Sequence, residues 1–148
     1  MSLEFVFCTR FYEISAVDIT LHILRKECMI MILVGIDIGK NQHTFSIIDK
    51  NTGEILSNPS FFPNNREGFL FLIKKLNTYS KSDLLIGMED TGHYHFALLK
   101  HLLDSRYTVA LINPTTTDLT RKLQGGITKN DTLDSLTICD VLDTPERK

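Results

Sequence analysis

The segment that most constrains the fold is an apolar run at residues 32–38, which only Gly35 and Asp37 interrupt. Such a run is typical of a strand that is buried on both faces in the middle of a sheet. An isolated carboxylate in these surroundings costs several kcal/mol of desolvation free energy. We therefore expect a central strand in which Asp37 has a specific partner.

The remaining pattern, from residue 31 onward, alternates strands and helices. Apolar runs and turn signals predict further strands at residues 43–48, 54–57, 84–88 and 109–112. Apolar residues at helical spacing predict helices at residues 64–77, 96–103, 114–123 and 131–143. The expected fold class is α/β: a mixed sheet with an antiparallel hairpin, and parallel strands flanked by helices.

Three local patterns are assigned no chemistry. Asn64 and Glu67 have the spacing of a capping box at the start of a helix. Residues 61–62, both phenylalanine, are expected to form an apolar loop that covers a sheet edge. His93 and His95 point in different directions at the start of a helix, which favours ordinary helix-terminal residues over a metal site.

Length and composition exclude several classes of protein. The chain has 148 residues, enough for one domain with its own core, and a net charge of -2, which argues against nucleic-acid binding through a general positive field. It has no apolar run of the roughly 18 residues that a bilayer-spanning helix requires. Its 3 cysteines share no metal-ligand spacing, so we expect a reducing, cytoplasmic setting.

The first thirty residues lack the strong pattern of the rest. Residues 1–30 are interpreted as an N-terminal extension that is not integral to the domain, with Met29 or Met31 as the natural start. The domain is expected to cover residues 31–148. A genuine extra helix packed on the domain is the alternative.

Four carboxylates are the candidate site. Asp37 lies inside the central strand and Glu89 at the end of the next buried strand, at the edge where open α/β sheets place their ligands, and neighbouring strands would bring the two together. Asp131 and Asp134 lie on the same stripe of the last helix as Ile138, which is expected to face the protein. Converging carboxylates suit hard divalent cations, and two such ions clamp the attacking and leaving oxygens of a phosphodiester displacement.

Each acid also has a simpler interpretation. Asp37 could cap a turn at the end of its strand, and Asp131 could be the N-cap of its helix. Asp134 could add only a favourable helix-dipole charge. Asp90 could replace Glu89 as the ligand, since adjacent residues point to opposite sides of a strand.

The motifs that carry these acids, together with two further motifs between them, resemble those of a known family. They are Gly35-Ile36-Asp37-Ile38-Gly39-Lys40, His43-Thr44-Phe45, Met88-Glu89-Asp90-Thr91-Gly92, Asn113-Pro114 and Thr128-Lys129-Asn130-Asp131-Thr132-Leu133-Asp134-Ser135. In this order they resemble the N-terminal domain of DEDD transposases, insertion-sequence recombinases related to the Piv and MooV invertases. The resemblance implies an RNase H-like fold similar to that of the RuvC Holliday-junction resolvase.

The resemblance also implies the roles of particular residues. Asp37, Glu89, Asp131 and Asp134 match the catalytic, metal-binding acids, which would hold Mg²⁺ or Mn²⁺, with two ions expected. Lys129 matches a basic position and is a candidate phosphate contact. Arg121 and Lys122 are further candidate nucleic-acid contacts; for all three, an ordinary solvated surface residue is the alternative.

The implied function is DNA transposition or site-specific recombination by metal-dependent phosphoryl transfer. The implied partner is DNA, with a structured guide RNA, a homo-oligomer or a full-length transposase as further candidates. Family members continue into a C-terminal domain with a nucleophilic serine, which this sequence does not contain, so we expect weak or no activity from it alone. A non-enzymatic remnant that binds DNA, RNA or a full-length transposase is one alternative, and an actin-like ATPase or sugar-kinase fragment is another.

Overall fold

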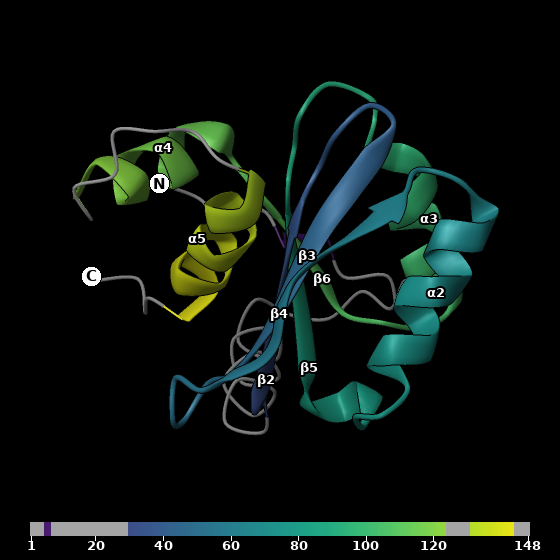
Figure 1. Cartoon of the computed structure of the whole chain (residues 1–148), viewed down its shortest axis with the longest axis horizontal. Coiled ribbons are helices and arrows are strands. Elements are labelled where there is room, and N and C mark those ends of the chain that lie inside the picture. The colour runs from purple at the N-terminus through teal and green to yellow at the C-terminus, as the bar shows by residue number, and fades with distance from the viewer. Residues whose placement is uncertain (1–4, 7–29, 124–130, 144–148) are drawn as a thin grey trace, which may run out of the picture.

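The computed structural model describes residues 5–6, 30–123 and 131–143, with side chains at all of these positions except 5–6, 121 and 131–133 (Figure 1). The strands are β1 (Phe5–Val6), β2 (Ile32–Asp37), β3 (Gln42–Asp49), β4 (Ile55–Pro63), β5 (Leu84–Glu89) and β6 (Val109–Ile112). The helices are α2 (Arg66–Leu76), α3 (Phe96–Asp104), α4 (Pro114–Leu123) and α5 (Asp131–Asp143), with a short 3-10 helix, η1 (Lys81–Asp83).

The described strands form one mixed sheet in the order β1-β6-β5-β2-β3-β4. The strand β2 is parallel to β5 and antiparallel to β3, and β5 is parallel to β6. Figure 1 shows α2 and α3 on one face of this sheet and α4 and α5 on the other. The predicted fold class is therefore confirmed, with β2 as a central strand.

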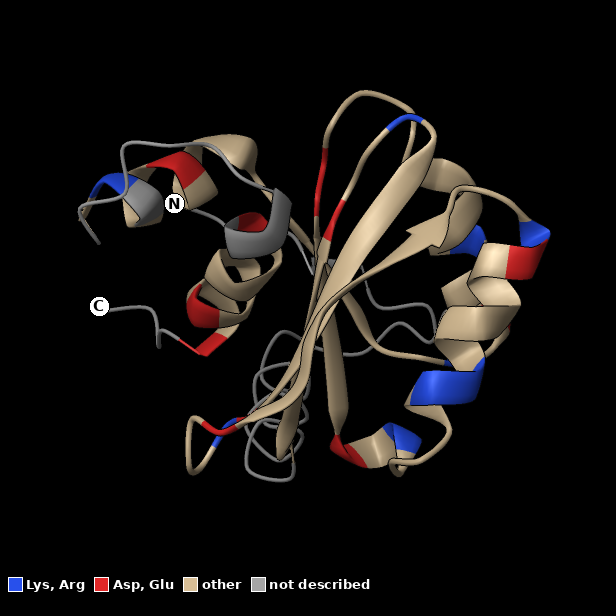
Figure 2. Ribbon diagram, in the orientation of Figure 1, with Lys and Arg blue, Asp and Glu red and all other residues tan. Residues whose placement is uncertain are grey.

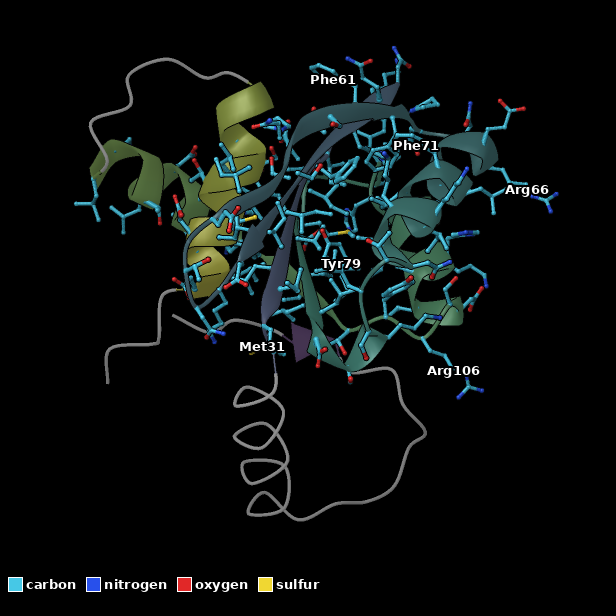
Figure 3. All side chains as sticks on the ribbon, turned by 60° about the horizontal axis from the view of Figure 1, so that its bottom comes forward. Met31, Phe61, Arg66, Phe71, Tyr79 and Arg106 are labelled. Carbon is cyan, nitrogen blue, oxygen red and sulfur yellow. The ribbon has the colours of Figure 1, made fainter. Side chains whose placement is uncertain are left out.

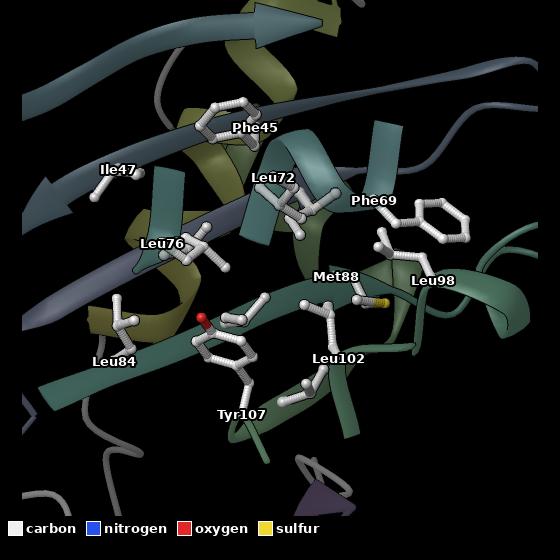
Figure 4. Close-up of a cluster of buried hydrophobic side chains, with 14 of the residues drawn as sticks. Phe45, Ile47, Phe69, Leu72, Leu76, Leu84, Met88, Leu98, Leu102 and Tyr107 are labelled. Carbon is white, nitrogen blue, oxygen red and sulfur yellow. The ribbon is translucent and has the colours of Figure 1, made fainter. Parts of the chain in front are cut away.

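The larger core lies between the sheet and the α2–α3 layer (Figure 4). Alternate residues of the central strands, including Val34, Ile36 and Ile86, are fully buried there. Leu72 of α2 and Leu102 of α3 pack against them from the helix side and are also fully buried. The period-2 alternation of the strands thus assigns one face of the sheet to this core and leaves the other face for α5.

Helix α5 packs very closely against the other face of β2. A Cβ atom added to Gly35 would lie 2.0 Å from the carbonyl oxygen of Ser135, closer than any real contact. Next to this point, the hydroxyls of Ser46 in β3 and Ser135 are buried and 2.6 Å apart, within hydrogen-bond distance. Gly35 is thus required because the helix backbone occupies the space that a side chain would fill.

The buried thiol of Cys139 shows the direction in which α5 crosses the sheet. Its Sγ lies 3.9 Å from the carbonyl oxygen of Leu33, whereas Ser135 lies against Gly35. The helix therefore runs antiparallel to β2, and its first turn lies toward the carboxyl end of that strand. Burial raises the pKa of the Cys139 thiol to about 12, which keeps it protonated.

Two local predictions were wrong. Residues 61–62 belong to strand β4 rather than to a loop, and they pair with Thr44 and His43 of β3. Phe62 is buried, whereas Phe61 is 52% exposed on the outside of the molecule (Figure 3). The N-cap of α2 is Asn65 instead of Asn64, because the Asn65 side chain accepts a hydrogen bond of 2.9 Å from the Gly68 N–H.

In the N-terminal segment, the structure describes Phe5 and Val6, which pair antiparallel with Ala110 and Val109 of β6, and Ile30, which is buried next to the start of β2. Phe5 and Val6 add a short strand at the edge of the sheet. The predicted start at Met29 or Met31 stays a prediction, and the alternative helix lies outside the described residues.

The close approach of α5 predicts the effect of enlarging Gly35. Gly35→Ala is expected to lower the free energy of unfolding by about 3 kcal/mol, because the new methyl group collides with helix backbone that cannot move without breaking the packing of α5. Urea unfolding would measure the loss. The matched control is Gly53→Ala, at a turn position with a φ of 71° and open space around it, where only about 1 kcal/mol of backbone strain is expected. Equal losses in the two variants would contradict the packing argument.

Candidate metal centre

Asp37 and Glu89 are brought side by side by the parallel pairing of β2 with β5. The last paired residues of the two strands are Ile36 and Met88, so the following residues, Asp37 and Glu89, are level with each other on strands about 4.8 Å apart. Ile36 and Met88 point into the core under α2 and α3, so both acids point to the opposite face, where α5 lies. Glu89 is 9% exposed and Asp37 is half-buried.

Asp134 is placed at the same end of the sheet by the packing of α5. It directly precedes Ser135, which lies against Gly35, and the helix runs antiparallel to β2, so Asp134 lies beyond Gly35 in the direction of Asp37. Its side chain is 1% exposed. Figure 2 shows acidic segments at the ends of β2 and β5 and near the start of α5, all toward the upper end of the sheet in this view.

The buried stripe predicted for the last helix is present where the structure describes it. Asp134, Ile138 and Val141 are all buried, and Ile138 packs with Ile112, the register partner of Glu89. The side chain of Asp131, the first residue of α5, lies outside the described residues. The placement of three of the predicted acids is thus known, and that of the fourth side chain is not.

The described acids do not yet form a closed metal cage. Among the side chains that the structure describes, no three His, Cys, Asp or Glu residues are close enough together to hold one ion. The donor chemistry nevertheless fits a hard divalent cation, since Mg²⁺ is usually bound by one or two carboxylates and completes its shell with water and substrate phosphates. The level pair of Asp37 and Glu89 supplies that minimum set.

Asp90, the alternative to Glu89, lies in different surroundings. Its side chain is 60% exposed, and its Oδ1 is 3.5 Å from Nε2 of His95, a residue that is 1% exposed. Glu89, in contrast, is buried on the side of the sheet where α5 packs. The burial of Glu89 favours it over Asp90 as a ligand that acts together with Asp37.

The predicted nucleic-acid contacts are only partly described. Lys122 is exposed near the end of α4. Arg121 belongs to the same helix, but its side chain is outside the described set, as is the whole of Lys129. Their proposed contacts with phosphate stay predictions.

Within the described part of the chain, no helix combines the length and hydrophobicity needed to cross a membrane.

His43 is a residue of the site region that the sequence analysis placed in a motif without assigning it a role. It is 1% exposed, packs against Phe62 and Phe69, and accepts a hydrogen bond of 3.2 Å at Nδ1 from the backbone N–H of Gly39, in the loop that follows Asp37. Burial lowers the pKa of His43, and the neighbouring side chain of Asn64 opposes that shift. A neutral ring is what this hydrogen bond requires, because a protonated Nδ1 has no lone pair to offer.

The depressed pKa of His43 predicts a pH-dependent stability. The unfolded chain binds a proton at this residue near pH 6.5, whereas the folded chain resists it, so the free energy of unfolding should fall as the pH drops below about 6.5. Urea unfolding between pH 7.5 and 5 would measure this, and His43→Phe should flatten part of the dependence. An unaltered pH profile in His43→Phe would refute the assignment.

Comparison with known proteins places this arrangement in context. The family model for DEDD transposases of the IS110 type, described as a transposase, matches residues 34–147. No curated protein matches the chain.

Two solved structures of RuvC from Thermus thermophilus share the fold. The one in complex with a Holliday junction substrate has a TM-score of 0.55 at 12% sequence identity, and the match covers 75% of this chain and 91% of that one. A second RuvC structure has a TM-score of 0.51 at 13% identity, with 75% and 92% covered. The RNase H-like, RuvC-like fold expected from the motifs is thus confirmed.

Proposed function

The chain belongs to the DEDD transposase family, over residues 34–147, and from this premise we propose that Asp37, Glu89, Asp131 and Asp134 form its catalytic metal centre. The family carries out DNA transposition and generally depends on divalent metal ions. The observation that carries the proposal is the level placement of Asp37 and Glu89 on adjacent parallel strands. Mg²⁺ or Mn²⁺ is the ion we propose, with two ions in the complete site.

The acids of the sheet and the acids of α5 have different tasks in this proposal. Asp37 and Glu89 hold one ion from the sheet, and Asp134, with Asp131, approaches from α5 to complete the ligand set. When bound, the ions supply Lewis-acid stabilisation of negative charge at the scissile phosphate. The carboxylates act as ligands and not as general bases. The burial of Glu89 and Asp134 lowers the local dielectric, which strengthens their attraction for a cation.

The nucleic-acid partners follow from the family. DNA is the partner of this family. We propose that three basic residues that precede α5 in the sequence contact the phosphates of the DNA: Arg121, Lys122 and Lys129. We also propose that the reaction takes place in the cytoplasm. We also propose that the chain binds a structured guide RNA and assembles with a further transposase chain. Pulldown of RNA that survives moderate salt would test the binding of the guide RNA.

The direct test is the loss of one carboxylate. Asp37→Asn should lower the rate at which branched DNA is cleaved in the presence of Mg²⁺ by about 100-fold or more, which is the usual cost of losing one electrostatic stabiliser of a transition state. It should also weaken Mn²⁺ binding, measured by calorimetry without DNA, which gives a result even where this chain cleaves slowly. Asp104→Asn, an exposed acid of α3 that pairs with Lys100, is the control of equal charge change.

Two outcomes would refute the assignment. Equal cleavage by the wild-type chain and Asp37→Asn would exclude Asp37 from the reaction. Mn²⁺ binding that weakens equally in Asp37→Asn and Asp104→Asn would show a general charge effect instead of a specific site.

A further inference from the structure

The pairing of β2 with β5 ends one residue before the two acids. The last paired residues are Ile36 and Met88. Beyond them the chain enters two loops: residues 38–41, which lead from Asp37 into β3, and residues 90–95, which lead from Glu89 into α3. Asp37 still pairs with Thr44 of β3, and Glu89 with Ile112 of β6, but the two acids are not among the paired residues of β2 and β5. Their spacing therefore depends on how these loops are held as well as on the sheet.

A single side chain connects the two loops. The amide Nδ2 of Asn64 donates hydrogen bonds to the carbonyl oxygen of Lys40, at 3.1 Å, and to that of Tyr94, at 3.4 Å. The backbone N–H of Asn64 also donates to the carbonyl oxygen of Asn41, at 2.9 Å. The first loop is thus tied twice to Asn64, and the second loop is tied to the same amide.

Asn64 is itself firmly placed. It follows Pro63, which ends β4 in register with Gln42, and it precedes Asn65, which caps α2. A Cβ added to Gly68 in the first turn of α2 would lie 1.9 Å from the carbonyl oxygen of Pro63, so strand and helix meet at close range. Asn64 therefore transmits the rigidity of this corner to both loops.

The first loop is held from a second side as well. The backbone N–H of Gly39 donates to Nδ1 of the buried His43. His43 packs against Phe62 and Phe69, so its ring has little freedom to move. The loop after Asp37 is thus fixed by His43 at its start and by Asn64 at its end. Of these two residues, Asn64 is the one that also binds the loop after Glu89.

We propose that Asn64 is a positioning residue of the metal centre: its side-chain amide ties the loop that follows Asp37 to the loop that follows Glu89, and so sets the spacing of these two carboxylates. This inference rests on the proposed function of the two acids. The bonds that the Asn64 amide donates go to the backbone of the two loops, and its effect on the acids passes through that backbone.

The test variant is Asn64→Asp, which keeps the size of the side chain and replaces the donor NH₂ group with an oxygen. Both hydrogen bonds to carbonyl oxygens are lost. By charge alone, a new carboxylate near the site would tighten the binding of a cation. The positioning role predicts the opposite, an affinity for Mn²⁺ about tenfold lower than that of the wild-type chain, the scale of loss seen when a group that orients metal ligands is removed.

The control variant is Asn58→Asp, which makes the same charge change on an exposed residue of β4. It should bind Mn²⁺ as the wild-type chain does. Hydrogen exchange, measured on the metal-free protein, is the second readout: Asn64→Asp should speed the exchange of backbone amides in residues 38–41 and 90–95 together, and Asn58→Asp in neither. Should Asn64→Asp fail to fold, Asn64→Ala removes the same bonds without a charge.

The outcomes separate this inference from the proposed function. Wild-type binding of Mn²⁺ that Asp37→Asn weakens, with unchanged or tighter binding in folded Asn64→Asp, would overturn the positioning role alone. Absence of Mn²⁺ binding by the wild-type chain would overturn the proposed function, and with it the role of Asn64 toward a metal. Unchanged exchange in either loop of Asn64→Asp would overturn the coupling of the loops whatever the metal result.

Discussion

The contact of α5 with Gly35 is the constraint on which the rest of the site depends. Because Gly35 has no side chain, the backbone of Ser135 reaches the surface of β2, and the buried hydroxyls of Ser46 and Ser135 fix the helix at that point. This position carries Asp134 to the carboxyl end of the sheet. A helix only a few ångströms farther out would move Asp134 away from this end of the sheet.

Much of this organisation could be predicted because it rests on short-range patterns. The apolar run of β2, the order of strands and helices, and the start of α4 at Pro114 are all local signals, and the structure confirms them. The position of Glu89 at the end of a buried strand was predictable for the same reason, whereas the metal-binding role of Asp37 and Glu89 stays a proposal. The inward stripe of α5 followed from helical periodicity, and Asp134 lies on it.

The features that were missed depend on contacts between distant parts of the chain. Asn64 has the sequence signature of a cap, but the neighbouring Asn65 performs that task, which leaves the Asn64 amide to join two loops. The sequence around Asn64 and Asn65 does not show which of the two caps α2. His43 resembles an ordinary polar residue of an alternating strand, and only the packing of Phe62 and Phe69 around it shows that it is buried. Phe62 was misassigned because Pro59 and Pro63 suggest a loop, whereas an edge strand tolerates both.

The level placement of Asp37 and Glu89 also has a consequence for folding. The carboxylates of Asp37 and Glu89 lie level only because β2 pairs with β5, so a cation that both of them hold can bind only to the folded chain. The binding free energy of such a cation would therefore add to the stability of the fold. Under the proposed function, the order of this end of the sheet would respond to the supply of divalent ions, whereas the core between the sheet and the α2–α3 layer contains neither of these acids.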